Sequence, residues 1–532
     1  MKKLVALFIA LVMILSLSTT AFAAEDTTLT IEDSDGRTYN GYQLLELTTS
    51  LKAGEHHTAH DGDHTSDCYN YAYTVNAKYR AIFQAEVFAN GGNYLWEGGT
   101  KPTTADGITD DHILKYLSNQ TSDNGDTYHT MRQVADSLYR AITAAGIAAD
   151  ETGLTGSNDS IAQGYWMIAD VTDLDGNEAN SLVMVDTKGQ DALTITPKTA
   201  LPTVEKKVKD IDDSEDSNIL DNAWLDSADH DIGDTVPFKL TGTLPSNAAF
   251  YTSFTMVFHD TLSNGLTLKT DSFKVYMYDT KYKADVDTDL NDGKDVTEKF
   301  TVTTSGLTDG CTFEVGCENV FSIVGVTKDT TFVVYYEATL NEYAEIGTPG
   351  NPNEVYLEFS NNPYGEGTGN TEKDEVVVYT YQLVINKTDS HGHALKGAGF
   401  TLYKKDLDGS YNAIGAELKG DDMTTFTWSG LDDGDYKLEE TTVPEGYNKM
   451  SDILFSISAV HNETLESLDG GVIGTGVVDT GAITKDIVNN TGTVLPETGA
   501  RGTVMLITIS TMLVMVAAVF MITRKKMSIY ED

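Results

Sequence analysis

Two segments with the alternating pattern of a β-strand carry lysines that could act as nucleophiles. They are TVEKKVKD (203–210) and LVINKTD (383–389), and in both an Asp follows the lysine. A lysine amine is nucleophilic only when it is neutral, and burial among apolar strand neighbours lowers its pKa toward that state. In the first segment Val204 and Lys206 share a face, because residues two apart in a strand point the same way. This spacing favours Lys206 over the adjacent Lys207 as the buried amine.

Residues 436–447, YKLEETTVPEGY, lie in the same β-rich block as the second lysine segment. They resemble the E-box of pilin and collagen-adhesin B-type domains, Tyr-x-Leu-x-Glu-Thr-x-x-Pro-x-Gly-Tyr, and match it at Tyr436, Leu438, Glu440, Thr441, Pro444, Gly446 and Tyr447. The resemblance implies that Lys387 condenses with Asn489, in DIVNN, to form an intramolecular isopeptide bond with release of ammonia. Glu440 is then the catalytic acid. A buried carboxyl keeps its proton and can polarise the asparagine carbonyl, so the reaction needs no cofactor.

The middle of the chain resembles the second domain of sortase-assembled backbone pilins. The resemblance is carried by SADHDIGDTVPFKLTGTLP, FTMVFHDTLSNGL and NEVYLEFSNNP. The order of these segments implies a second isopeptide bond, between Lys206 or Lys207 and Asn353. Asp260 is the expected acid, with Glu337 as the alternative. In the C-terminal domain, pairing of the first and last strands is expected to bring Lys387 and Asn489 together.

Both ends of the chain carry targeting signals. Two lysines and the apolar run 4–17 precede the small residues of TTAFAAED, which predicts a signal peptide (1–24) and export. Near the other end, the uncharged run 503–523 is long enough to cross a bilayer, and three basic residues follow it. Together with LPETG (495–499), the segment 493–532 is similar to the cell-wall sorting signal of Gram-positive surface proteins. In that family a sortase cleaves between Thr and Gly and transfers the Thr carbonyl, here that of Thr498, to an amine.

The acceptor amine is expected at the end of the N-terminal domain. Backbone pilins carry there a motif approximating Val-Tyr-Pro-Lys, whose lysine attacks the sortase acyl intermediate. This chain has Ile195-Thr196-Pro197-Lys198, with Thr in place of the usual Tyr, on a proline-flanked linker. The resemblance therefore implies a structural shaft subunit that is joined from Thr498 to Lys198 of the next copy. The implied partners are a pilus-specific sortase, identical subunits, tip and base pilins, and peptidoglycan.

Composition is consistent with an exported, folded, mainly β protein. The net charge of −45 argues against binding to nucleic acid or anionic membranes, and 40% hydrophobic residues with 27 Tyr can build real cores. A mixed α+β N-terminal domain (25–202) is expected, with helices at 128–146 and within 71–88. Immunoglobulin-like Greek-key sandwiches are expected at 203–378 and 379–492, because short alternating strands are separated by turn residues. A C-terminal membrane helix belongs to the sorting signal.

Two features are left outside this scheme. Three cysteines cannot form a disulfide framework, and a local pair of Cys311 and Cys317 is the less favoured alternative. The polar segment 55–68 holds His56, His57, His60 and His64, and we interpret it as a loop without a stable metal site. No hydrolase or phosphate-binding motif is present in the sequence, so no enzyme activity is predicted beyond self-catalysed bond formation. The alternative function is a wall-anchored adhesin present as a single copy on a B-type stalk.

Overall fold

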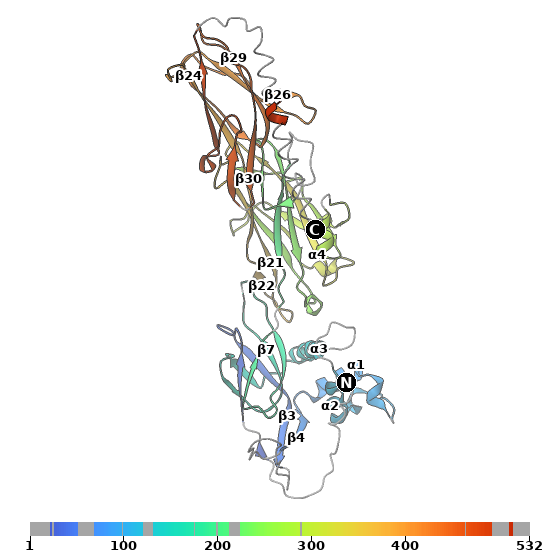
Figure 1. Cartoon of the computed structure of the whole chain (residues 1–532). Helices are drawn as coiled ribbons and strands as arrows, with labels where there is room; N and C mark the ends of the chain where they lie inside the picture. The colour runs from blue at the N-terminus through green and yellow to red at the C-terminus, as the bar shows by residue number, and fades with distance from the viewer. Residues whose placement is uncertain are drawn as a thin grey trace, which may run out of the picture.

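The computed structural model describes residues 22–23, 26–51, 69–97, 99–120, 131–174, 176–197, 200–211, 224–287, 290–462, 464–491 and 510–513. The chain forms an elongated row of three β-rich regions in sequence order (Figure 1). The predicted fold class, mainly β with a mixed N-terminal domain, is confirmed. Among the described residues no helix is long and apolar enough to cross a membrane. The predicted membrane span lies outside them except for four residues, Ser510–Leu513.

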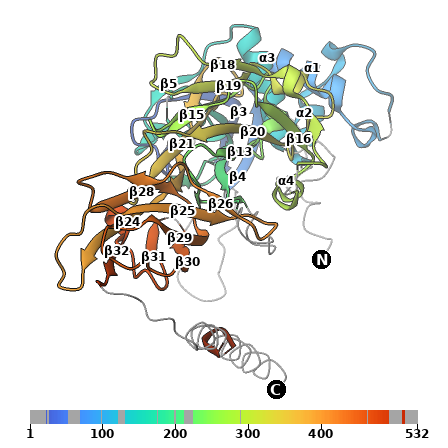
Figure 2. The same cartoon turned by 90° about the horizontal axis from the view of Figure 1, so that it is seen from above.

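The N-terminal region combines two sheets with a group of helices. Its larger sheet is β1 (Phe22–Ala23), β3 (Tyr39–Leu51), β7 (Gly164–Asp170) and β8 (Leu182–Asp186), with β4 (Tyr69–Val75) and β5 (Glu151–Leu154) also paired to β3. The smaller sheet is β6 (Asp159–Ile161), β2 (Thr27–Ile31) and β9 (Ala192–Ile195). The helices α1 (Arg80–Asn90), α2 (Asp110–Ser118) and α3 (Met131–Ala144) lie on one side of the larger sheet (Figure 1 and Figure 2). Their apolar faces share one core with that sheet, which explains the helical spacing seen in the sequence.

The middle region is a sandwich of two large sheets. The first follows the order β11 (Trp224–Leu225), β10 (Val204–Lys209), β13 (Thr235–Thr243), β20 (Thr331–Leu340), β16 (Lys274–Tyr278) and β17 (Lys294–Asp295), with β15 (Leu266–Leu268) on β20. The second follows β12 (Ser227–Asp229), β23 (Asp374–Tyr379), β21 (Asn351–Ser360), β14 (Met256–Leu262), β19 (Phe313–Cys317) and β18 (Thr301–Thr303), with β22 (Thr368–Asn370) on β21. A short helix, α4 (Lys281–Val286), lies beside the first sheet. Alternate residues of the long strands meet between the sheets in one apolar core.

The C-terminal region is a smaller sandwich whose first strand is separated from β23 by one residue, Thr380. One sheet is β28 (Thr425–Leu431), β24 (Tyr381–Asp389) and β32 (Ala482–Asn489). The other is β26 (Tyr411–Ala413), β25 (Gly399–Lys405), β29 (Gly434–Thr442), β30 (Ile453–His461) and β31 (Leu465–Asp469), with β27 (Leu418–Lys419) on β25. The first and last strands, β24 and β32, pair in parallel, and Lys387 stands opposite Ile487. Short 3₁₀ helices are η1 (Asn93–Trp96), η2 (Ala105–Gly107), η3 (Ala248–Phe250), η4 (Thr297–Lys299), η5 (Val320–Ser322) and η6 (Val478–Thr480).

Direct hydrogen bonds join neighbouring regions at both junctions. Between the first two regions, the buried Asn361 side chain donates to Leu174 O at 2.6 Å, and its backbone carbonyl accepts from Asn180 N at 2.9 Å. Between the last two, Ile232 N donates to Gly430 O at 3.0 Å. The row of domains is therefore held by specific contacts as well as by the linkers.

Candidate functional site

The middle sandwich buries a lysine, an aspartate and an asparagine in mutual contact. Lys206 comes from β10, Asp260 from β14 and Asn353 from β21, and all three are fully buried. Lys206 Nζ donates to Asn353 Oδ1 at 2.7 Å and forms an ion pair with Asp260. The lysine, the acid and the asparagine that the sequence favours as reaction partners are therefore adjacent in the folded chain.

Tyr336 completes this cluster and was missed by the sequence reasoning. Its hydroxyl lies 3.1 Å from both carboxylate oxygens of Asp260 and 3.0 Å from Lys206 Nζ. The same hydroxyl accepts a hydrogen bond from Asn353 Nδ2 at 2.7 Å. Tyr336 therefore contacts all three members of the cluster. The available signal was strand alternation in TFVVYYEATL, which places Tyr336 on the same inward face of β20 as Val334.

Burial moves the pKa values of the lysine and the aspartate toward each other. It lowers the pKa of Lys206 to about 8, and the nearby Asp260 only partly opposes this change. Burial likewise raises the pKa of Asp260 above its ordinary value, although Lys206 acts in the opposite direction. Aromatic rings of Phe238 and Tyr336, stacked at 5.2 Å, flank the amine and exclude solvent. Proton transfer from lysine to aspartate is consequently much less unfavourable here than in water.

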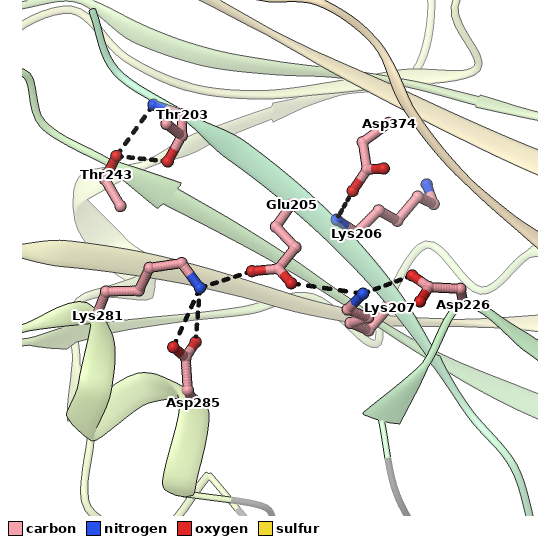
Figure 3. Close-up of polar contacts among 9 residues, drawn as sticks. All are labelled: Thr203, Glu205, Lys206, Lys207, Asp226, Thr243, Lys281, Asp285 and Asp374. Atoms are coloured by element: carbon pink, nitrogen blue, oxygen red, sulfur yellow. Dashed lines mark hydrogen bonds and ion pairs between the residues drawn. The ribbon is translucent and has the colours of Figure 1, made fainter.

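The two alternative residues lie elsewhere. Lys207 leaves β10 on the side opposite to Lys206, where it pairs with Asp226 and with Glu205 (Figure 3). Glu337, one residue beyond Tyr336, is partly exposed; it pairs with Lys269 at 2.7 Å. A strand has a side-chain period of two, so each alternative faces outward because its neighbour faces inward. The structure brings together Lys206, Asp260 and Asn353, and it leaves Lys207 and Glu337 outside the core.

The middle-domain partners meet across the sandwich and not along a pair of hydrogen-bonded strands. β10 and β21 belong to different sheets and are not hydrogen-bonded neighbours. Lys206 instead reaches across the sandwich to Asn353, while its backbone N–H donates to Asp374 Oδ2 at 2.6 Å (Figure 3). In this domain the partners meet because facing sheets, as well as neighbouring strands, bring inward side chains into contact.

In the C-terminal domain the corresponding residues are buried but less closely joined. Asn489 Nδ2 donates to Glu440 Oε1 at 2.7 Å, and Met450 N donates to Glu440 Oε2 at 2.9 Å. Lys387 Nζ donates to the backbone oxygens of Thr388 and Ile487, at 3.0 and 3.1 Å. Here the first and last strands pair as expected, with β24 beside β32.

Two details of this second cluster bear on its chemistry. Burial lowers the pKa of Lys387, and the charges of Glu440 and Asp389 oppose it only in part. Asn489 Oδ1 is buried and finds no hydrogen-bond partner within the described part of the chain. A half-turn of this amide would place Oδ1 against Glu440 in the position that Nδ2 occupies.

Several predicted residues fall outside the described part of the chain. These are the acceptor Lys198, the donor Thr498 and the histidines of the segment 55–68. Their flanks are described: β9 ends at Ile195 and β10 begins at Val204, so Lys198 belongs to the connection between the first two domains. Cys311 and Cys317 are both described, and they are free thiols rather than a disulfide.

The fold and the two clusters define a class of protein: a row of β-rich domains in which the last two each bury a lysine, an acid and an asparagine. Residues 381–469, from the start of β24 to the end of β31, match the SpaA prealbumin-like fold domain. The predicted resemblance of the C-terminal domain to pilin B-type domains is confirmed.

Comparison with known proteins extends the relationship beyond this domain. The chain is 26% identical over 318 residues to the trypsin-resistant surface T6 protein of Streptococcus pyogenes serotype M6, covering 56% of this chain and 53% of that protein. It therefore spans about half the length of this relative. Among solved structures it is similar to the T6 backbone pilin of the same organism, with 16% identity, a TM-score of 0.48, and coverage of 89% of this chain and 100% of that one. It is also similar to the major pilin SpaD from Corynebacterium diphtheriae, with 18% identity, a TM-score of 0.39, and coverage of 64% and 81%.

Proposed function

We propose that this protein is the structural major subunit of a covalent cell-surface pilus, stiffened by isopeptide bonds that it forms by itself. The observation that carries the proposal is the buried contact of Lys206 with Asp260 and Asn353. An ion pair sealed between two sheets is a poor way to gain stability, since desolvation offsets most of its attraction. A reactive cluster accounts for the amide placed directly beside the amine. The relationship to a streptococcal surface protein supports the same function.

The reaction in the middle domain begins with a proton transfer from Lys206 to Asp260. The neutral amine then attacks Asn353 Cγ, and the protonated Asp260 polarises the carbonyl. A bond forms between Nζ and Cγ while the bond between Cγ and Nδ2 breaks. As the new bond forms, the attacking nitrogen loses a second proton, which Asp260 relays to the departing nitrogen, and that nitrogen leaves as ammonia. The products are an amide cross-link, ammonia and a protonated Asp260, so neither an oxidant nor a cofactor is consumed.

Tyr336 would position the reacting groups during this reaction. Its hydroxyl contacts the carboxyl of Asp260 and the amide nitrogen of Asn353 at the same time. It can hold the amide with its carbonyl toward the amine, and it offers the acid a second hydrogen bond. The tyrosine pKa is raised well above its usual value by burial, so the hydroxyl remains a donor throughout.

The C-terminal domain would form its bond between Lys387 and Asn489 with Glu440 as the acid. Contact between Glu440 and Asn489 supports this assignment, as does the burial of all three side chains. The result would be one covalent cross-link in the middle domain and one in the C-terminal domain. The first joins opposite sheets of a sandwich and the second joins neighbouring strands. Each tie lies between elements that a pulling force would otherwise separate.

Polymerisation is proposed from two sequence signals, the segment that holds Lys198 and the sorting signal that holds Thr498. A pilus-specific sortase would hold one subunit through the carbonyl of Thr498 and transfer it to Lys198 of the next. The finished polymer would be attached to peptidoglycan, with tip and base pilins as further partners. The position of Lys198 between β9 and β10 supports this role, because a connection between domains can enter an enzyme cleft.

Two measurements test the proposal. Each cross-link releases one ammonia, about 17 Da, so the exported three-domain protein (residues 25–492) should be lighter than its sequence by two such losses. In the native strain, a sortase-dependent ladder of covalent multimers should appear on a denaturing gel. An unmodified mass would contradict the internal bonds. A single wall-linked band without a ladder would favour the adhesin instead.

A further inference from the structure

His259 precedes Asp260 on β14 and faces the opposite side of the sheet, away from the reactive cluster. Its side chain is 9% exposed. Nδ1 lies 2.8 Å from Asp309 Oδ2, 3.5 Å from Glu314 Oε1 and 4.0 Å from Cys311 Sγ. These four residues offer one donor atom each, all within 4.8 Å of one another. A nitrogen, a sulfur and two carboxylate oxygens therefore converge on one point of the outer face.

The fold determines the position of these donors. Glu314 on β19 stands directly opposite His259 in the antiparallel register. Asp309 and Cys311 come from the connection between β18 and β19, where Cys311 N donates to Asp309 Oδ1 at 3.2 Å. The Tyr356 ring stacks on His259 at 4.5 Å, and its hydroxyl donates to Asp309 Oδ2 at 2.6 Å. Both the imidazole and the carboxylate are thus oriented before any ligand arrives.

The second ring nitrogen of His259 also supports a metal site here. His259 Nε2 is buried and has no hydrogen-bond partner within the described residues, and Glu358 Oε2 lies 3.7 Å away. A metal-binding histidine commonly donates its other N–H to a carboxylate, which fixes the ring and strengthens the ligand. Glu358 on β21 is placed for that role, and a small approach would complete the hydrogen bond.

The donor set selects the kind of ion. Calcium and magnesium prefer oxygen ligands and do not use a thiolate or an imidazole in their usual sites. Zinc and its first-row neighbours accept nitrogen, sulfur and carboxylate oxygen together, at about 2.0–2.3 Å in a tetrahedral arrangement. Adjacent ligand atoms in such a tetrahedron are roughly 3.3–3.8 Å apart, which the observed cluster can reach by small side-chain movements.

Local charge favours a cation here. Asp309, Glu314 and Glu358 surround a single imidazole, so the carboxylates outnumber the positive charge that His259 can supply. Asp309 is exposed, and an ion can therefore reach the cluster from solvent. On binding, the ion would displace the proton of Nδ1 and the thiol proton of Cys311 into solvent.

We propose that His259, Asp309, Cys311 and Glu314 form a binding site for a zinc-class divalent ion on the outer face of the middle sandwich. The ion would tie the connection after β18 to strands β14 and β19. It would lie behind Asp260, on the opposite face of the same strand. The site is independent of the isopeptide chemistry, and its failure would leave the proposed pilus function untouched.

Cobalt is the probe of choice, because a thiolate bound to Co²⁺ gives an intense near-ultraviolet charge-transfer band. The titration uses the three-domain protein in which the four histidines of segment 55–68 are replaced by glutamine and Cys68 by serine, so that neither an imidazole nor a thiolate of this segment contributes. We expect one Co²⁺ per chain, displaced by Zn²⁺, and a melting temperature that rises with added Zn²⁺. Cys311→Ser should abolish the band and weaken Zn²⁺ binding at least about tenfold.

The matched control is Cys317→Ser. Cys317 lies on β19, shortly after Cys311 in the chain, and its side chain is in the apolar core. This variant should keep the band. His259→Gln removes a second ligand, and circular dichroism shows whether this variant folds. If it does not fold, Glu314→Gln takes its place. The site is overturned if no thiolate band appears, if the band survives in Cys311→Ser, or if all binding is lost with the loop histidines.

Discussion

Removing the amide of Asn353 should isolate the contribution of the middle-domain cross-link to stability. In an Asn353→Ala variant, Lys206 keeps its ion pair with Asp260 and its hydrogen bond to Tyr336, so no buried charge loses its partner. The variant lacks only the bond that would join positions 147 residues apart, together with a few side-chain atoms. The chain-entropy relation assigns about 5 kcal/mol to a cross-link that closes a loop of this length.

This free energy is large enough to be seen in a melting curve. For a domain of 150–250 residues, 1 kcal/mol corresponds to roughly 2–4 °C in Tm, so the transition of the middle domain should fall by about 10–20 °C. Differential scanning calorimetry of the three-domain protein measures this, and intact mass of the same samples should show one ammonia loss instead of two. Asp260→Ala should lose the same bond and melt at least as low, because its Lys206 also loses a partner. Lys207→Ala, on the opposite face, should match the parent.

Two results would refute this reasoning at different steps. A parent protein with the unmodified mass would show that the cluster does not react. A variant that has lost the cross-link by mass, yet melts within about 3 °C of the parent, would show that the bond contributes little to equilibrium stability.

Four further predictions concern the chemistry and the assembly. Glu440→Ala should abolish the C-terminal cross-link alone, and tryptic maps that still contain the joined Lys387–Asn489 peptide would contradict its role. Tyr336→Phe should slow formation of the middle bond by roughly 10²-fold without preventing folding, as followed by mass after refolding; an unchanged rate would remove the tyrosine from the mechanism. The rate at which the middle bond forms should vary less than about threefold between roughly pH 6 and pH 8. The reason is that the proton passes from Lys206, whose pKa is lowered, to Asp260, whose pKa is raised, and no proton is released to solvent. A rate that changes about tenfold per pH unit would contradict this. Lys198→Ala should eliminate the multimer ladder on an immunoblot while the monomer remains exported and cross-linked, and a persistent ladder would place the acceptor elsewhere.

Much of the reactive chemistry could be predicted because it depends on local patterns. The alternation in TVEKKVKD selects Lys206 over Lys207, since an inward lysine must share a face with Val204 and Val208. The E-box identifies Glu440 by motif alone. The resemblance to pilin domains, which short segments carry, implies that Asn353 and Asn489 are the bonding asparagines. These assignments need only the period of a strand and a resemblance carried by short strings of residues.

Other features depend on which strands face each other across a sandwich. Tyr336 and Asp260 come from opposite sheets, and no short-range pattern shows that their side chains meet. The same holds for the crossing of Lys206 to Asn353. The outer cluster around His259 likewise joins β14 to a connection 50 residues away.

The sequence by itself determined the mainly β class, the candidate lysines, acids and asparagines, and the signals that predict export and polymerisation. These follow from composition, from side-chain alternation and from contiguous motifs, all of which are local properties of the chain. Tertiary structure alone decided that Asp260 rather than Glu337 lies beside Lys206, that Tyr336 contacts every member of the cluster, and that Lys387 is bonded to backbone oxygens. The physical reason is that a strand specifies which side chains point inward, whereas the packing of two sheets decides which inward side chains touch.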